Sequence, residues 1–578
     1  MAIDLTLRIG GEGGEGVISA GDFLMQAASL AGMEVVTFKS FPAEIKGGYA
    51  LSQLRVSDQP ILSQGDGFNI LIAFNGEAYE VNKSLLTPGT VMIYDTGSEA
   101  DFEPEELPGV IMYPVPMGEI AKRQLKAYIT KNMVALGAAA ELFNIPVDTL
   151  KESIRKKFTR KGDKVVQLNY QALDAGAEHV RNNLQKKESF EFPKPREKKD
   201  VLIIEGNQAI ALGAAMAGCN YYGAYPITPA TTVGNYLAEL ILGLGGFVYQ
   251  AEDEIAALGT CLGASFAGAK VLTATSGPGI SLMTELIGLG IMAEIPLVIA
   301  NIQRGGPSTG MPTKHDQGDL YQACFGTHGD APKIVLAPAN VEENLYLIID
   351  AFNLAEKYQT HVFFLSDASL ALRVEAIKRP DMSRIEHVHR MTRNGNTDEK
   401  FLRYISTESG ISPTGIPGMT GHAYAATGLE HAENSGPRTS TDIRNKMTDK
   451  RWRKFENIED EWKPVEREGD EQAEVGIISW GLTQSIAKEA VQRLRAKGLK
   501  VAALYPKMIW PLPIKAISKF ADSVNKILIP EVNFQGQFAQ MIKSAIPIHD
   551  KLVQLNVYRG EPFIPREIEE KVEEIYPK

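Results

Sequence analysis

Cysteine is scarce in this chain, and the cysteines that it has are not clustered. Its 578 residues include only Cys219, Cys261 and Cys324, and no two of these form a CxxC pair. Iron–sulfur clusters and structural zinc sites need several closely spaced ligands, and the nine histidines form no HExxH-like set either. We therefore expect no metal site in this chain, and we interpret the three cysteines as reduced, buried thiols.

An excess of positive charge and a long apolar run are also missing. The chain has 60 basic and 71 acidic residues, a formal net charge of −11, whereas nucleic-acid and anionic-membrane binders need a basic surface. The most apolar stretch, residues 286–300, contains Glu294 and is shorter than the ~18–20 residues of a membrane span. The opening MAIDLTLRIGGEGG lacks the layout of a signal peptide. We expect a cytoplasmic protein that binds neither nucleic acid nor membrane.

The length exceeds what one hydrophobic core supports, and the patterns indicate an α/β protein of several domains. Residues 1–185 alternate strand and helix patterns, and a charged, proline-containing linker follows at 186–200. A second α/β region is expected over 201–380, with apolar strands typical of a sheet covered on both faces. An irregular polar excursion spans 381–470, and 471–578 form a compact strand–helix–strand unit.

A rigid turn rich in threonine and proline lies early in the second region. In NYYGAYPITPATT, Pro226 and Pro229 flank Thr228 and keep its backbone extended, just ahead of a predicted helix. A hydroxyl in this place can contact a ligand. It can equally cap the helix, and the segment alone does not decide between the two.

Carboxylates stand directly before another helix, in the segment YQAEDEIAALGTCLGASFAG. Negative charge there has an ordinary explanation, because it complements the helix dipole for about 0.3–1 kcal/mol. The later segment TATSGPG favours a ligand instead, because its glycine-rich turn ends a buried strand at the edge where α/β sheets bind ligands. Glu254, with Ala257 three residues on and Gly263 nine on, and this later turn together resemble the pyrimidine-binding domain of thiamine-diphosphate enzymes.

That resemblance implies a catalytic role for Glu254. Its carboxylate would bond N1′ of the aminopyrimidine, and a proton held there favours the imino tautomer that generates the thiazolium ylid.

An arginine follows the next strand, in ANIQRGGPSTGMPTKHDQGD. A lone Arg304 in such a loop is usually a surface group, but in a pocket its planar fork suits a carboxylate. YPITP, QAEDE, TATSGPG and RGGPSTGMPT in this order resemble the alpha subunit of 2-oxoacid:ferredoxin oxidoreductases. GGEGGEGVISAG and FPAEIKGGYALSQLRVS resemble that family's gamma domain, here fused ahead of alpha, and the last region resembles its transketolase-C-like domain. The 2-oxoglutarate type of this fusion matches best.

The resemblance also implies roles for further residues and for other molecules. Thr228 and Pro226 would lie on the thiamine side of the site, while Arg304, Thr313 and Lys46 would bind the substrate. Coenzyme A would sit near the gamma domain. The implied cycle oxidatively decarboxylates a 2-oxo acid to acyl-CoA and CO₂, passes electrons to ferredoxin, and can run in reverse.

Two glycine motifs in the first region invite other interpretations. GEGGEG at 11–16 matches GxGxxG, but its two glutamates would repel the pyrophosphate of NAD or FAD, so we interpret it as a tight turn near coenzyme A. GDG at 65–67 has no Asn in the window 92–100, so the Mg²⁺ motif of thiamine-diphosphate enzymes is incomplete. We therefore expect a beta subunit that holds Mg²⁺, the diphosphate and a [4Fe–4S] cluster, in an (alpha–beta)₂ assembly.

Three alternatives stay open. A non-oxidative thiamine enzyme would need the GDG…N half in the same chain, and a non-enzymatic homologue is disfavoured by Glu254, Thr228 and Arg304. A dicarboxylate carries a second charge that must be matched in a dry pocket. Pyruvate has one carboxylate and needs one cation, whereas this chain offers two, Arg304 and Lys46. Lys314 and His315, which lie next to Thr313 in the sequence, could add positive charge or could equally be solvated. The second cation favours 2-oxoglutarate over pyruvate or a broad range of 2-oxo acids.

Overall fold

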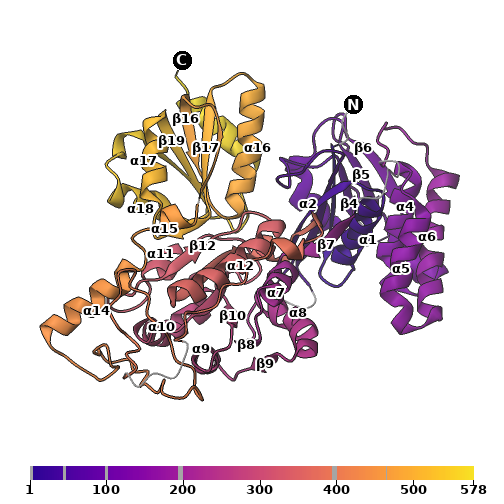
Figure 1. The fold of residues 1–578 in the computed structure, drawn as a ribbon. Helices are drawn as coiled ribbons and strands as arrows, with labels where there is room; N and C mark the ends of the chain where they lie inside the picture. Colours follow the sequence, from indigo (N-terminus) through magenta and orange to yellow (C-terminus); the bar gives the residue numbers. More distant parts are fainter. Residues whose placement is uncertain are drawn as a thin grey trace. The chain divides into compact units, whose positions relative to one another are not determined.

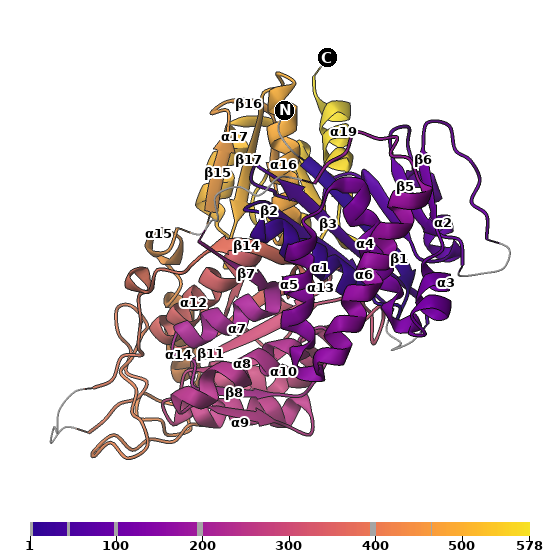
Figure 2. The ribbon, with the colours of Figure 1, turned by 90° about the vertical axis from the view of Figure 1, so that its right-hand side faces the viewer.

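The computed structural model describes residues 4–42, 47–97, 102–192, 200–393, 400–463 and 465–577. These form two compact units, one made of Met1–Ile204 with Leu372–Arg379 and the other of Glu205–Ala371 with Pro380–Lys578. We call them unit 1 and unit 2 and describe each by itself (Figures 1 and 2). The predicted α/β class is confirmed, since helices accompany three sheets of eight, seven and five strands. No described helix is long and apolar enough to cross a membrane.

Unit 1 is built on a mixed eight-stranded sheet in the order β6-β5-β4-β1-β3-β2-β14-β7. Its strands are β1 (Asp4–Glu12), β2 (Glu34–Ser40), β3 (Tyr49–Ser57), β4 (Ile70–Ala73), β5 (Val91–Asp95), β6 (Ile111–Val115), β7 (Val201–Glu205) and β14 (Val374–Lys378). β1 pairs antiparallel with β3 but parallel with β4, so the chain direction switches beside β1. The carboxyl ends of the parallel strands β1, β4, β5 and β6 lie at one edge of the sheet, which is where α/β sheets bind ligands.

Helices α1 (Val17–Leu30), α4 (Lys131–Phe143), α5 (Val147–Phe158) and α6 (Asp163–Asn183) belong to the same unit. α4 and α6 pack unusually closely, because a Cβ at Gly137 would collide with the carbonyl of Leu173, and one at Gly176 with that of Val134. The two glycines therefore set how closely these backbones approach.

Unit 2 contains a second sheet in the order β18-β12-β13-β11-β10-β8-β9. Its strands are β8 (Tyr221–Ala224), β9 (Phe247–Gln250), β10 (Val271–Thr275), β11 (Leu297–Gln303), β12 (Ile334–Leu336), β13 (His361–Asp367) and β18 (Met508–Trp510). Every residue of β10, β11 and β13 is buried, as expected for parallel strands covered on both faces. The covering helices include α7 (Gly206–Met216), α8 (Thr231–Ile241), α9 (Glu254–Phe266), α10 (Gly277–Met292) and α12 (Val341–Tyr358).

The last part of unit 2 is a five-stranded sheet in the order β15-β17-β16-β19-β20. Its strands are β15 (Val465–Gly469), β16 (Ala473–Ile478), β17 (Val501–Pro506), β19 (Val524–Glu531) and β20 (Leu552–Asn556), accompanied by α16 (Leu482–Ala496), α17 (Ile514–Asp522), α18 (Gln537–Ala545) and α19 (Pro565–Ile575). β18, which follows β17, pairs antiparallel with β12, so the two sheets of unit 2 are joined through the chain itself.

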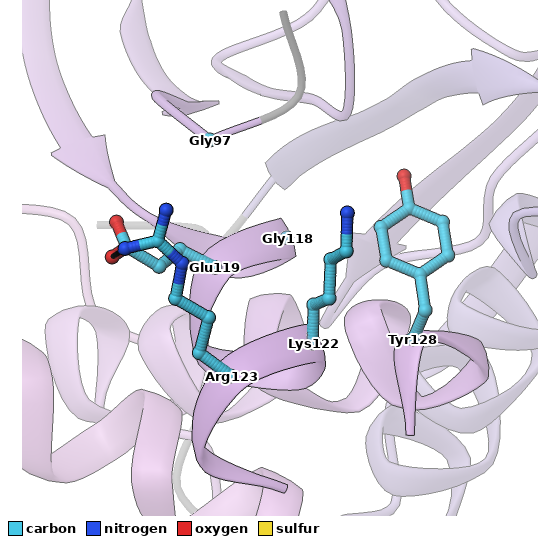
Figure 3. Close-up of a pocket in the computed structure, with 6 residues that line it drawn as sticks. All are labelled: Gly97, Gly118, Glu119, Lys122, Arg123 and Tyr128. Atoms are coloured by element: carbon cyan, nitrogen blue, oxygen red, sulfur yellow. Dashed lines mark hydrogen bonds and ion pairs between the residues drawn. The ribbon is translucent and has the colours of Figure 1, made fainter. Parts of the chain in front are cut away.

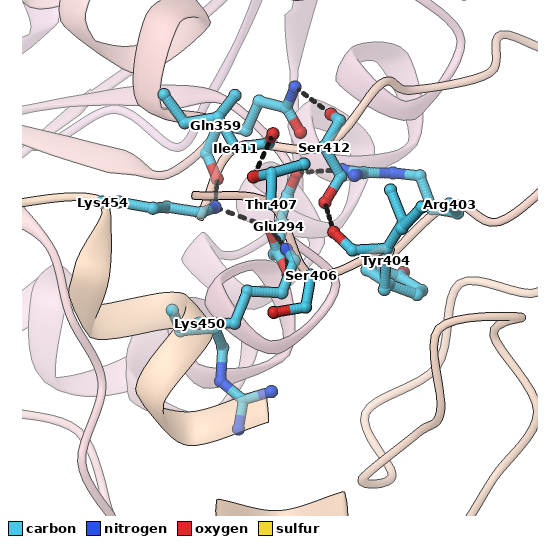
Figure 4. A network of polar contacts seen from close by, with 12 residues as sticks. Glu294, Gln359, Arg403, Tyr404, Ser406, Thr407, Ile411, Ser412, Lys450 and Lys454 are labelled. Carbon is cyan, nitrogen blue, oxygen red and sulfur yellow. Dashed lines mark hydrogen bonds and ion pairs between the residues drawn. The ribbon is translucent and has the colours of Figure 1, made fainter. Parts of the chain in front are cut away.

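The polar excursion of unit 2 is held by a buried ionic cluster (Figure 4). Glu294 lies in the turn after α10 and is 2% exposed. Lys450, in α14 (Thr441–Arg453), and Lys454 contact its two carboxylate oxygens at 2.7 and 2.6 Å, and Arg403 donates to its carbonyl at 2.9 Å. Burial lowers the pKa of Lys454 to about 7, although Glu294 opposes this shift. The cluster therefore fastens Arg403, Lys450 and Lys454 of the excursion to the connection between α10 and β11 of the seven-stranded sheet.

Candidate active site

Glu254 is the first residue of α9, but it is not the residue that caps the helix. Asp253 takes that role, because its Oδ1 accepts a hydrogen bond from the Ala256 N–H at 2.7 Å. The Glu254 side chain is 6% exposed, and its carboxylate makes no hydrogen bond or ion pair within the described part of the chain. A buried carboxylate costs free energy unless something pairs with it. The ordinary capping explanation therefore applies to Asp253, and Glu254 is left available for a ligand.

The Ser276–Gly279 turn lies against this carboxylate. Ser276 is the N-cap of α10, and Gly277–Gly279 form the first turn of that helix rather than a separate loop. A Cβ on Gly279 would stand 3.0 Å from Glu254 Oε1 and would collide with Thr275 Oγ1. The hydroxyls of Thr275 and Ser276 are buried and without a partner among the described residues. Two motifs that lie 25 residues apart in the sequence thus meet at the carboxyl end of β10, where glycine provides the space that they need.

Thr228 and Arg304 also come together at this edge. Arg304 follows β11 directly and is 8% exposed, and its Nη1 donates to the carbonyl of Thr228 at 2.5 Å. Thr228 and Pro226 are exposed, and α8 has Ala230 as its N-cap with no side-chain hydrogen bond, so Thr228 does not cap the helix. Arg304 Nε is buried without a described partner. Burial lowers the pKa of Arg304, and nearby Asp319 opposes this shift.

The loop after Arg304 is a short hairpin that carries Thr313. Met311 N–H donates to the Gly305 carbonyl at 2.8 Å, and Gly305 N–H donates to the Lys314 carbonyl at 3.2 Å. Arg304 and Thr313 therefore belong to one compact loop. Lys46, the third predicted substrate residue, lies outside the described residues, and its placement beside this loop stays a prediction.

The predicted tight turn at GEGGEG is present in unit 1. Gly14 and Gly16 have φ values of 101° and 84°, and the Gly13 N–H donates to the Gly48 carbonyl at 2.9 Å. Glu15 is neutralised by buried Lys131, whose Nζ lies 2.8 Å from Glu15 and 3.0 Å from Asp95. The loop is thus fixed at the carboxyl end of β1, with Lys131 shared between the carboxylates of Glu15 and Asp95.

Two hollows lie beside this loop at the carboxyl ends of the strands. One of about 420 Å³ is lined by Gly97, Gly118, Glu119, Lys122, Arg123 and Tyr128 (Figure 3). The other, of about 480 Å³, is lined largely by residues of the glycine loop and of the start of α1. Arg123 pairs with Glu119 at 2.9 Å, whereas Lys122 extends toward the first hollow. Glycine backbone and a cation together suit an anionic ligand.

Several polar residues of the unit 2 edge were not predicted from the sequence. Asn301 and Gln303 are buried in β11 and bond Asp319, and Asp367, the last residue of β13, lies 2.9 Å from His315 Nδ1. Polar residues inside an otherwise apolar parallel strand are a readable signal, because they need partners that an apolar strand does not supply.

Three family profiles together match most of the chain. "Pyruvate ferredoxin/flavodoxin oxidoreductase" matches residues 6–179, and "Pyruvate flavodoxin/ferredoxin oxidoreductase, thiamine diP-bdg" matches 212–450. "Pyruvate:ferredoxin oxidoreductase core domain II" matches 473–561. The thiamine-binding profile covers Glu254, Thr228 and Arg304.

Relatives match over the whole length. The alpha subunit of 2-oxoacid:ferredoxin oxidoreductase 2 from Aeropyrum pernix is 31% identical over 99% of this chain and 98% of its own length. The 2-oxoglutarate oxidoreductase subunit KorA of Mycobacterium tuberculosis is 31% identical over 98% and 90%. A solved 2-oxoglutarate:ferredoxin oxidoreductase from Magnetococcus marinus, with 2-oxoglutarate, coenzyme A and succinyl-CoA bound, is 47% identical, with TM-score 0.94 and 99% of both chains covered. The predicted family is confirmed: this chain belongs to the 2-oxoacid:ferredoxin oxidoreductases, as an alpha subunit with a fused gamma-like domain.

Proposed function

We propose that this chain is the alpha subunit of a 2-oxoglutarate:ferredoxin oxidoreductase that converts 2-oxoglutarate and coenzyme A to succinyl-CoA and CO₂. The observation that carries the proposal is the buried, unpaired carboxylate of Glu254 beside the glycine turn at the end of β10. When bound, thiamine diphosphate supplies the carbanion that attacks the 2-oxo carbon and accepts the electron pair left by CO₂. Glu254 holds the proton at N1′ of the aminopyrimidine, and Thr228 and Pro226 line the cofactor side.

Replacing Glu254 by Gln tests this assignment. An amide keeps the size of the side chain but cannot stabilise the N1′ proton as a carboxylate does, so turnover with the partner subunit should be almost abolished. Asp253→Asn is the matched control, because it changes the neighbouring carboxylate that only caps α9. Full activity in Glu254→Gln would exclude the thiamine role of this residue.

The substrate carboxylates are bound by Arg304, Thr313 and Lys46. Arg304 keeps a buried Nε without a described partner even though Nη1 is used on Thr228, so part of its fork remains for an anion. 2-Oxoglutarate is favoured because the predicted substrate residues include two cations, Arg304 and Lys46, and because the M. marinus relative binds it. Steady-state kinetics of Arg304→Ala and Lys46→Ala on 2-oxoglutarate and pyruvate decide the point. A wild-type preference for pyruvate, or equal losses on both substrates, would favour pyruvate or a broad range.

Coenzyme A is bound by unit 1, with its anionic groups near Lys122 and the glycine loop. The hollows at the carboxyl ends of β1, β5 and β6 support this location, and the M. marinus relative supports coenzyme A as the ligand without indicating where it binds. Lys122→Ala should raise the KM for coenzyme A, while Lys164→Ala, which changes an exposed lysine of α6, should not. An unchanged KM for coenzyme A in Lys122→Ala would show that coenzyme A binds elsewhere.

A beta subunit completes the site with the diphosphate half, Mg²⁺ and a [4Fe–4S] cluster, in an (alpha–beta)₂ assembly that reduces ferredoxin. Among described residues no group of three potential metal ligands occurs, and all three cysteines are buried and free. Ile255, directly after Glu254, is 50% exposed, and Leu282, early in α10, is 53% exposed. This apolar rim beside the thiamine half-site is the face that the beta subunit covers.

Co-purification of the two subunits tests whether the beta subunit covers this apolar face. Ile255→Asp should weaken recovery of the beta subunit, and Ile514→Asp, in the last domain, serves as a control of similar exposure, 46%. Equal recovery in both variants would refute the docking face. The domain division at 1–185, 186–200, 201–380, 381–470 and 471–578, and the cytoplasmic location, stay predictions.

A further inference from the structure

The segment that follows the substrate loop is hydrogen-bonded to the seven-stranded sheet of unit 2 on one side. His315 Nδ1 lies 2.9 Å from Asp367 Oδ1, at the end of β13. Asp319 accepts a hydrogen bond from Asn301 Nδ2 at 3.0 Å, and its own N–H donates to Gln303 Oε1 at 3.2 Å. Residues 315–319 therefore lie along the carboxyl ends of β11 and β13, immediately after the loop that carries Arg304 and Thr313.

The last domain holds this segment as well, since the His315 N–H donates to the Gly560 carbonyl at 3.1 Å and the buried Gln317, in the middle of the segment, faces that domain. Gln317 is 1% exposed, and its Nε2 donates to the Trp480 carbonyl at 3.0 Å. Its Oε1 accepts from Thr483 Oγ1 at 2.8 Å and from the Val532 N–H at 3.0 Å. Its backbone N–H donates to the Val532 carbonyl at 2.8 Å, and its carbonyl accepts from Asn533 Nδ2 at 3.2 Å. The side-chain amide and the backbone of Gln317 are thus both bonded to the last domain.

We propose that Gln317 is a positioning residue for the 2-oxo-acid site, through which the last domain fixes the far end of the substrate loop. The inference rests on the proposed role of residues 304–313 in binding the substrate. The near end of that loop is fixed by β11, and backbone hydrogen bonds from Met311 to Gly305 and from Gly305 to Lys314 close the loop, RGGPSTGMPT, into one unit. Where Thr313 lies therefore depends on how the chain is held just after it. Buried, fully paired amides are suited to this, because each misplaced bond leaves a buried polar group unpaired.

A purely structural role for Gln317, joining two domains, is the competing explanation. It predicts a loss of stability with no change in substrate affinity. The two explanations separate in the KM for the 2-oxo acid, measured with the complete alpha–beta enzyme.

Thr483→Val is the sharpest variant, because it removes one hydrogen bond to Gln317 from the side of the last domain and leaves the substrate loop untouched. Thr483 is fully buried, and valine has nearly its shape. Ser485→Ala is the matched control. It lies two residues on in α16, is buried, and donates a hydrogen bond of 2.7 Å across to the Ala339 carbonyl, away from the substrate loop. Gln317→Leu is expected to have the larger effect, because it removes every side-chain hydrogen bond of Gln317.

We expect Thr483→Val to raise the KM for 2-oxoglutarate roughly 3–10-fold, and Gln317→Leu to raise it further, with the KM for coenzyme A unchanged. Ser485→Ala should lower the melting temperature similarly and leave both KM values within about twofold. In the double variant Thr483→Val/Gln317→Leu the two effects on the KM for 2-oxoglutarate should not add, because both substitutions remove the same hydrogen bond.

Equal KM values in Thr483→Val and Ser485→Ala would overturn the inference, and a rise in the KM for coenzyme A alone would do the same. Arg304→Ala separates this failure from failure of the proposed function. If Arg304→Ala raises the KM for the 2-oxo acid and Thr483→Val does not, the substrate loop is assigned correctly and Gln317 is structural. If Arg304→Ala has no effect either, the substrate assignment itself is wrong.

Discussion

Glu294→Gln removes one negative charge from a buried cluster of cations, and we expect it to destabilise unit 2 strongly. In the wild type the Glu294 carboxylate contacts Lys450 and Lys454, and all three side chains are 3% exposed or less. Although burial itself acts in the opposite direction, Lys454, Lys450 and Arg403 hold the pKa of Glu294 well below its usual range. Removing one partner of a buried pair leaves an uncompensated charge and typically costs about 3–5 kcal/mol.

The pH dependence of this loss follows from the lysines. Burial lowers the pKa of Lys454 from 10.5 to about 7, so between these values the unfolded chain binds a proton that the folded chain does not. The free energy of unfolding therefore rises with pH over that window. In Glu294→Gln the carboxylate that favours charged Lys454 is gone, so its pKa falls further. The deficit of the variant should be largest below about pH 7 and should shrink as the lysines lose their protons.

Thermal unfolding and amide hydrogen exchange of α14 at pH 6, 7.5 and 9 measure this effect. α14 should lose protection first, because Lys450 is the residue that anchors it. Asp460→Asn is the control, because the Lys515–Asp460 pair lies in exposed surroundings and should contribute nothing measurable. A loss below about 1 kcal/mol at pH 6, or a loss that does not shrink at pH 9, would refute the electrostatic reasoning.

Three further predictions concern the site and its scaffold. Gly279→Ala should greatly reduce thiamine-diphosphate-dependent turnover, because the new Cβ would displace Thr275 and Glu254; wild-type kinetics with the beta subunit present would contradict this. Gly176→Ala should destabilise unit 1 by about 1–3 kcal/mol through overpacking against the Val134 carbonyl, and an unchanged melting temperature would show that α4 and α6 can separate. The isolated chain should bind thiamine diphosphate weakly and contain no iron, which calorimetry and metal analysis can check; stoichiometric iron would contradict a cluster held by the partner.

The sequence predicted structural features correctly where a local pattern has only one physical cause. Apolar runs predicted the buried parallel strands. E-x-x-A with T-S-G-P-G indicated a shared ligand site, and the structure brings Glu254 and Gly279 together. The Thr228 segment left capping and ligand contact equally open, and only the structure separates them, because Ala230 is the N-cap of α8. The return of β14 to the sheet of unit 1 was not predictable, since pairing across more than 300 residues leaves no local periodicity. Gln317 was missed for the same reason, because its partners lie at 480–483 and 532–533.

Buried polar groups lie toward both ends of the unit 2 sheet. α10 begins at the Ser276–Gly279 turn and leads to Glu294, so it joins the catalytic edge to the ionic cluster. Around Glu294 a single carboxylate faces Lys450, Lys454 and Arg403, and Arg403 Nε and Nη1 have no described partner. Further buried polar atoms without described partners lie at the carboxyl ends of the strands: Thr275 Oγ1, Ser276 Oγ, Asn301 Oδ1, Arg304 Nε, His315 Nε2 and Ser366 Oγ. Each unpaired buried group costs about 1–3 kcal/mol. A fold retains such a cost at the carboxyl edge when water, a ligand or a partner chain pairs these atoms there.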